Sequence, residues 1–156
     1  MNKIIDLYVT LFNLGKIKYM PGSFGSIASY IIIFIIYKFS SYLFLILIFL
    51  IILITCIYTI GIYISKTKTK DPKEIIIDEF IGCYVIFIFF PLFENFNLYY
   101  LIFSSFIIFR AFDIIKPFPI NIIDKNMNNS IGIILDDVVA GFYTILILVL
   151  INEYIL

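Results

Sequence analysis

Two pairs of adjacent acidic residues stand in or beside apolar stretches of this chain. Asp78 and Glu79 open the segment DEFIG, and Asp136 and Asp137 lie within GIILDDVVAG. A carboxylate in such surroundings is costly and needs a cation, a proton or water near it. Each pair is followed one helical turn later by small residues, which let another backbone approach closely: Gly82, Ala140 and Gly141. We therefore expect two helices that pack at their glycines and turn their carboxylates toward each other.

A third charged segment, FRAFDIIKPFPINIIDK, covers residues 109–125. Arg110, Asp113 and Lys116 follow one another at three-residue intervals, so they share one face of a helix. That helix should end before Pro117, because proline disfavours helical geometry in the residue before it. The spacing predicts a charged ridge on the last helical turn, either as a ladder of salt bridges or as a site for an anion.

A short segment rich in glycine and serine, YMPGSFGS, occupies residues 19–26. Backbone N–H groups in a turn of this kind can bind an anion. Gly22 and Ser23 lie within it, and Lys16 and Lys18 precede it. The simpler alternative is a connecting loop before the first apolar run.

The residue types that are absent narrow the chemistry further. The chain has no histidine, which excludes histidine phosphatases, Ser-His-Asp hydrolases and zinc sites with histidine ligands. Cys56 and Cys83 lack the spacing of a redox pair and are expected to be small apolar residues. Clustered carboxylates suit a hard cation such as Mg²⁺, which prefers oxygen ligands. With basic residues nearby, they predict phosphoryl chemistry on a lipid head group, with water or an aspartate as the nucleophile.

These residues must be positioned by membrane helices. The chain is 63% hydrophobic and 14% charged, with no net charge and a mean hydropathy of +1.11, which excludes a disordered chain, a nucleic-acid-binding protein and an ordinary soluble enzyme. Its apolar runs lack a polar stripe, so we predict an all-α, polytopic membrane helix bundle of about four to five spans, forming one domain over residues 1–156. The runs cover residues 27–37, 42–64, 80–93, 98–115 and 131–151, and residues 4–14 form an interfacial or re-entrant helix.

The distribution of lysine predicts the orientation. With five spans, the side that holds the N-terminus receives nearly all lysines, including those of residues 66–73, whereas the other side receives Lys38. Lysine and arginine prefer the cytoplasmic side of a membrane. The acids of the three charged segments fall on that same side: Asp78, Glu79, Asp113, Asp124, Asp136 and Asp137.

These segments resemble, in the same order, the motifs of the phosphatidylglycerophosphatase A family. The motifs are MPGSFGS, DEFIG, FRAFDIIKPFPI with Asp124, and GIILDDVVAG, and the match runs from about Gly15 to Gly141. Two positions depart from the family pattern, since Met20 replaces an alanine and Ser23 replaces a threonine. The resemblance implies an all-α enzyme of the bacterial inner membrane that uses Mg²⁺ to remove the terminal phosphate of phosphatidylglycerophosphate, giving phosphatidylglycerol.

The resemblance also implies roles for individual residues. Asp78, Glu79, Asp136 and Asp137 would be the metal-binding or catalytic carboxylates, with Asp113 and Asp124 as second choices for the metal. The alternative role of Asp113 is to orient Arg110 and Lys116. Arg110 and Lys116 would hold the substrate phosphates, aided by Gly22 and Ser23. The expected partner is a membrane phospholipid, with no nucleic acid, and the oligomeric state is left open. The alternative function is an acid-lined transporter for protons or cations, because acids within membrane segments also serve as proton relays.

Overall fold

The computed structural model describes residues 3–67, 72–94, 96–127 and 129–155, and within these ranges the chain is helical and has no strand. Lys68 and Lys70, which entered the orientation argument, lie outside the described residues. The elements in chain order are α1 (Lys3–Val9), the 3₁₀ turn η1 (Leu14–Lys16), α2 (Pro21–Phe39), α3 (Tyr42–Thr67), α4 (Ile77–Ile88), the 3₁₀ turn η2 (Phe90–Phe93), α5 (Leu98–Ile115), α6 (Ile120–Asn126) and α7 (Ser130–Ile155).

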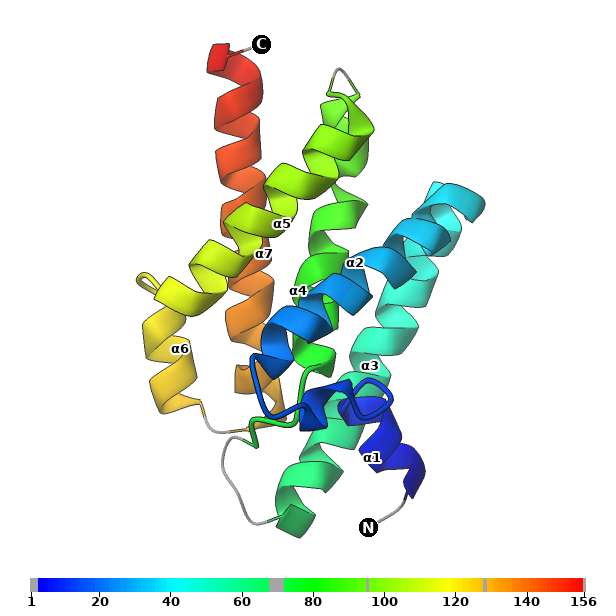
Figure 1. Ribbon diagram of the computed structural model, residues 1–156, viewed down its shortest axis with the longest axis vertical. Coiled ribbons are helices and arrows are strands. Elements are labelled where there is room, and N and C mark those ends of the chain that lie inside the picture. Colours follow the sequence, from blue (N-terminus) through cyan, green and yellow to red (C-terminus); the bar gives the residue numbers. More distant parts are fainter. Residues whose placement is uncertain (1–2, 68–71, 95, 128, 156) are drawn as a thin grey trace.

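Four of these helices, α2, α3, α5 and α7, are long and apolar enough to cross a membrane. Figure 1 shows them as a bundle, with α4 running between them and the two termini at opposite ends. The all-α membrane bundle of about four to five spans is therefore confirmed. The range of four to five spans arises from α4, because its 12 residues rise only about 18 Å and cannot alone cross a core of about 30 Å.

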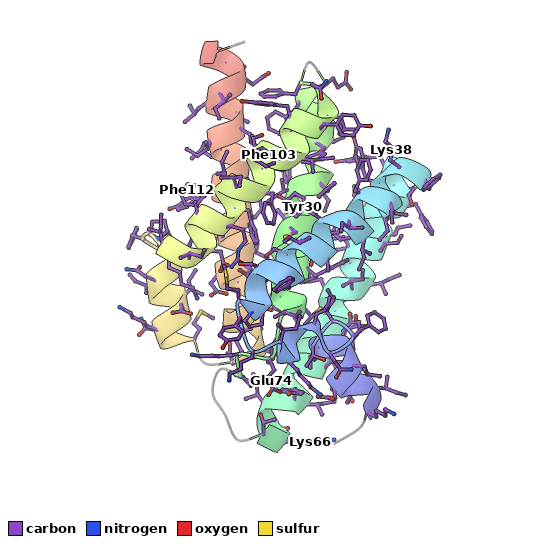
Figure 2. All side chains as sticks on the ribbon, viewed as in Figure 1. Tyr30, Lys38, Lys66, Glu74, Phe103 and Phe112 are labelled. Atoms are coloured by element: carbon purple, nitrogen blue, oxygen red, sulfur yellow. The ribbon has the colours of Figure 1, made fainter. Side chains whose placement is uncertain are left out.

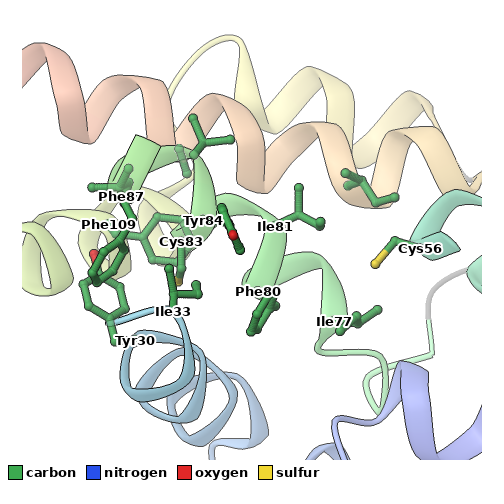
Figure 3. Packing of buried hydrophobic residues seen from close by; sticks show 14 of the residues in the cluster. Tyr30, Ile33, Cys56, Ile77, Phe80, Ile81, Cys83, Tyr84, Phe87 and Phe109 are labelled. Carbon is green, nitrogen blue, oxygen red and sulfur yellow. The ribbon is translucent and has the colours of Figure 1, made fainter. Parts of the chain in front are cut away.

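Helix α4 forms the centre of the hydrophobic core. It packs against α7, α2, α3 and α5, and every residue from Glu79 to Phe87 is buried. Figure 3 shows Phe80, Ile81, Tyr84 and Phe87 of this helix surrounded by side chains from its neighbours. Both Cys56 and Cys83 are buried and unpaired, as expected for small apolar residues. The third apolar run is thus hydrophobic because it faces other helices on all sides.

The predicted packing of two helices at their glycines is confirmed where α4 crosses α7. A Cβ atom added at Gly141 would lie 2.7 Å from the carbonyl oxygen of Gly82. One added at Gly82 would lie 2.7 Å from the carbonyl oxygen of Asp137. This close approach requires glycine on both helices, and it brings the two acidic pairs to the same level of the bundle.

The segment predicted as a glycine-rich turn is instead the start of α2. Pro21 is the first residue of the helix, where its missing N–H has no cost, and Met20 before it has a left-handed backbone with φ of 51°. Gly22 and Ser23 therefore lie in the first helical turn. This correction also lengthens the first apolar run from residues 27–37 to a helix of 19 residues that can span the membrane.

Candidate active site

The six predicted carboxylates line one cavity of about 250 Å³, at the end of the bundle where α2 and α4 begin. Figure 1 shows that the starts of α2, α4 and α7 lie at about the level of α6, toward the end that holds the N-terminus, with α6 next to α7. Lys73, Lys116 and Pro21 line the same cavity. The acids come from four parts of the chain: Asp78 and Glu79 of α4, Asp113 of α5, Asp124 of α6, and Asp136 and Asp137 of α7.

Arg110 connects three helices beside this cavity. Its Nη1 lies 2.5 Å from Oδ2 of Asp113, which confirms the predicted pairing at three-residue spacing, and 3.5 Å from Oε1 of Glu79 on α4. The same guanidinium donates hydrogen bonds to two hydroxyls of α2, those of Ser26 at 3.1 Å and Ser23 at 3.4 Å. Its Nε–H is buried and has no partner among the described residues, so Arg110 retains a free donor.

Glu79 is fixed by α2 as well as by Arg110. The hydroxyl of Ser26 donates to Oε2 of Glu79 at 2.7 Å. Gly22 leaves the room that the carboxylate needs, because a Cβ atom there would lie 2.3 Å from Oε1 of Glu79. The glycine and serine residues of this segment therefore bring the start of α2 against the acidic pair of α4.

Lys116 departs from the predicted ridge. Helix α5 ends at Ile115, as Pro117 requires, and Lys116 takes a left-handed backbone with φ of 47° that turns its side chain away from the helix face. The side chain pairs with Asp124 and, at 2.9 Å, with Asp136, whereas the described ion pairs of Asp113 include only Arg110. Burial lowers the pKa of Lys116, but the hydrogen bonds that its ammonium donates to Asp124 and Asp136 outweigh this effect and hold the pKa above its ordinary value.

These pairings leave two of the six acids without a cation. Asp137 is 3% exposed, and its carboxylate has no hydrogen bond or ion pair with the described residues. The Oδ1 atom of Asp78 is likewise buried without a partner. Both residues line the cavity. Two buried carboxylates with free oxygens suit a bound cation, which would offset the desolvation of each.

The described residues contain no group of three or more acids or cysteines placed to hold a metal ion by themselves. The six carboxylates share a cavity, but four of them face arginine or lysine. Mg²⁺ is commonly held by one or two carboxylates together with water and substrate phosphates. The two unpaired acids therefore fit a magnesium site of this kind and do not fit an ion enclosed by protein ligands alone.

Two residues at the site escaped the sequence-based prediction. Ser26 is fully buried and contacts both Glu79 and Arg110, yet it stands in the same motif as Gly22 and Ser23 and could have been chosen with them. Lys73 lines the cavity and forms no ion pair with a described residue. Lys73 could have been identified from the sequence because it stands only five residues before Asp78, which keeps it near the start of α4.

Comparison of the sequence with known proteins assigns the chain to a family. The family model described as phosphatidylglycerophosphatase A matches residues 7–152. A phosphatidylglycerophosphatase A of Haemophilus influenzae is 32% identical over 97% of this chain and 91% of its own length. That of Escherichia coli is 30% identical over 92% of this chain and 80% of its own length. No solved structure gives a significant match. This chain is therefore an enzyme, a membrane-embedded phosphatase that belongs to the phosphatidylglycerophosphatase A family.

Proposed function

We propose that this phosphatase hydrolyses the terminal phosphate monoester of phosphatidylglycerophosphate, leaving phosphatidylglycerol, as a step of glycerophospholipid biosynthesis. The names of the two relatives and the family match over residues 7–152 support this substrate. The observation that carries the proposal is the cavity in which six carboxylates meet Lys116, beside Arg110. Such a site offers both cations for a phosphate and free carboxylates for the reaction.

Asp78 and Asp137 are our proposed ligands for Mg²⁺, because they carry the unpaired oxygens of the cavity. When bound there, the ion would neutralise phosphate charge and lower the pKa of a water molecule at the site. The four paired acids complete the negative surroundings of the cavity, and they remain within reach of further coordination through water: Glu79, Asp113, Asp124 and Asp136.

The basic residues bind and orient the substrate phosphate in this proposal. Arg110 is held by Asp113 and Glu79, and Lys116 is held by Asp124 and Asp136, so both cations are fixed before the lipid arrives. A planar guanidinium offers two parallel donors to phosphate oxygens, and the free Nε–H of Arg110 adds one more. Ser23 lies beside this guanidinium and supplies a hydroxyl at the phosphate position.

We also propose that the chain lies in the bacterial inner membrane with this cavity at the cytoplasmic face. Figure 2 shows Lys66 near the end of the molecule that holds the N-terminus and Lys38 at the opposite end. Lys16, Lys116 and Lys125 belong to elements at the first of these ends. An excess of lysine at one end of a membrane bundle favours the cytoplasm for that end.

Phosphate release by the purified protein in detergent tests the proposed reaction. Asp78→Asn and Asp137→Asn should each lower the turnover of phosphatidylglycerophosphate by about a hundredfold or more, as should removal of Mg²⁺ with EDTA. Measured without Mg²⁺, the thermal stability of the two variants should be kept or raised, since each change removes a carboxylate charge that no described cation contacts. Glu94→Gln, at the far end of the bundle, is the matched control and should leave turnover unchanged.

Three results would contradict this scheme. Full turnover in EDTA would show that the reaction does not need Mg²⁺. Full turnover by either asparagine variant would show that the substituted residue is not part of the site. Faster hydrolysis of phosphatidic acid than of phosphatidylglycerophosphate would contradict the proposed head group.

A further inference from the structure

A groove with an apolar lining separates α2 from α5 next to the active site. It encloses about 210 Å³ and is lined by Ile27 and Ile31 of α2 and by Tyr99, Phe103 and Phe106 of α5, with Tyr30 between the two helices. Figure 2 shows Tyr30 between α2 and α5, with Phe103 on α5. No charged residue lines this groove.

The floor of the groove is rigid and offers no free polar group. Tyr30 is 5% exposed, and its hydroxyl donates to the buried hydroxyl of Ser105 at 3.2 Å. Its ring packs edge-on against Phe87 and Phe106. The rims are open, since Ile31 is 58% exposed and Phe103 is 67% exposed. In a bundle that crosses a membrane, these rims face the lipid, so an apolar chain can enter from the side.

The groove leads to the phosphate-binding residues of the proposed site. Ser23 precedes Ile27 by one turn of α2, and Arg110 follows Phe106 by one turn of α5. The hydrogen bond from Arg110 to Ser23, at 3.4 Å, joins the two helices where the groove ends. Within one helical turn, the side chains therefore change from apolar residues of the groove to the cationic Arg110. This order matches that of a lipid phosphate, in which an apolar acyl chain is joined to an anionic head group.

The distance from Arg110 to the far end of the groove at Tyr99 also fits one lipid chain. From Arg110 back to Tyr99, helix α5 rises roughly 16 Å at about 1.5 Å per residue. Half of a hydrocarbon core of about 30 Å is about 15 Å, which is the depth of one leaflet. An acyl chain that begins beside Arg110 would thus lie against the groove along one leaflet.

We infer that the α2–α5 groove binds an acyl chain of the lipid phosphate substrate while Arg110 holds its phosphate-bearing head group. This inference rests on the proposed function for the identity of the head group. It adds that the enzyme recognises the chain as well as the phosphate, and that the substrate enters laterally between α2 and α5. A bystander membrane lipid in the same groove is the competing occupant, and it would have no effect on turnover.

The test compares two substrates that share a head group and differ in chain length. Ile31→Trp fills the groove and should lower kcat/KM for dioleoyl phosphatidylglycerophosphate about tenfold, the effect of losing contact with roughly two methylene groups. It should leave kcat/KM unchanged for a water-soluble analogue with acetyl chains. Ile51→Trp on α3 is the matched control, because Ile51 is 62% exposed on a helix that does not line the groove, and both substrates should be unaffected.

An equal loss for both substrates, or no loss for either, would overturn the inference. A dioleoyl analogue with a photoreactive group in its chain gives a second measurement that does not depend on turnover. It should label α2 or α5 of the wild-type protein at residues that line the groove, and labelling confined to α3 and α7 would overturn the inference. Labelling of the groove in a protein that releases no phosphate would instead contradict the proposed function and leave the groove as a lipid site.

Discussion

Each cation at the centre of the site contacts two acids, and this pairing determines which carboxylates remain free. Arg110 takes Asp113 and Glu79, and Lys116 takes Asp124 and Asp136. Ion pairs of this kind fix long side chains in one orientation, which is what the proposed phosphate site requires. These four ion pairs leave Asp78 and Asp137 as the two acids that no described cation contacts.

The charge of Lys116 should persist across the working range of pH. In the folded protein the pKa of Lys116 lies above its ordinary value. The stabilisation that its ion pairs with Asp124 and Asp136 provide is therefore fully present at any pH below the ordinary pKa. It is lost only when the pH rises through the higher pKa of the folded state. We expect the KM of the wild-type enzyme to show no Lys116-dependent change between about pH 6 and pH 9. Lys116→Gln should raise KM about tenfold through loss of a charge-assisted contact, whereas Lys116→Arg should keep most of the affinity. KM profiles of the three proteins against pH decide this, and an unchanged KM in Lys116→Gln would make Lys116 a structural cation only.

Gly22 provides a test of whether the position of Glu79 matters for turnover. Gly22→Ala would place a Cβ atom 2.3 Å from Oε1 of Glu79 and 3.4 Å from Nη2 of Arg110, so the carboxylate must move away from the guanidinium. Because a side-chain end can move at small cost, we expect a change in thermal stability of less than about 1 kcal/mol and at least a tenfold loss of kcat. Gly61→Ala is the control, since its Cβ atom would meet only the hydroxyl of Ser130 at 3.7 Å. Equal activities of the two variants would contradict a role for this contact.

The sequence predicted the acids of the site better than their partners. The pair of Arg110 and Asp113 follows from helical spacing alone, and the structure confirms it. The partners of Lys116 depend on how α6 and α7 fold back onto the end of α5, which no local spacing describes. Ser26 and Lys73 were missed because serine in a helix and lysine in a connecting segment are ordinary there, and only the fold brings them to the cavity.

At the scale of elements, the apolar runs predicted where helices lie but could not distinguish lipid from protein around them. The run at residues 80–93 is as apolar as its neighbours, yet it lies in α4 and η2 and is largely buried. Burial on all sides by protein and exposure on all sides to lipid select the same residue types, so hydropathy alone cannot separate them. The beginning of α2 at Pro21 was also missed, because glycine and serine favour turns unless tertiary contacts override them.

The crossing of α4 and α7 should be the contact on which the geometry of the site depends most. Gly141→Ala would place a Cβ atom 2.7 Å from the carbonyl oxygen of Gly82, and a backbone atom cannot move aside as a side chain can. We expect a loss of about 1–3 kcal/mol in stability, typical of overpacking, together with loss of activity as Asp137 shifts relative to Asp78. Thermal denaturation in detergent and phosphate release measure the two effects. Gly61→Ala again serves as the control, and a Gly141→Ala protein with unchanged melting temperature would contradict the close contact.

At the scale of the whole molecule, the six acids of the candidate site gather at one end of the bundle. An acid-lined transporter, the alternative that the sequence left open, needs ionisable groups along a path through the membrane. In the described part of the chain, two cavities toward the other end are lined by Lys38, Ser40 and Glu94 together with aromatic and apolar residues. The family match and the concentration of acids at a single end both favour an enzyme that works at one membrane surface.

The same asymmetry allows the proposed orientation to be tested in intact cells. Lys125→Cys places a thiol at an exposed position of α6, at the end that holds the candidate site. Phe39→Cys places one at the opposite end, where Phe39 is 88% exposed. Cys56 and Cys83 are buried and should react slowly. If the lysine-rich end faces the cytoplasm, a membrane-impermeant maleimide should label Phe39→Cys in spheroplasts and should label Lys125→Cys only after the membrane is permeabilised. The reverse pattern would place the candidate site on the outer face of the membrane and would contradict the proposed orientation. The lysine-rich end of the bundle would then face away from the cytoplasm, contrary to the usual preference of lysine.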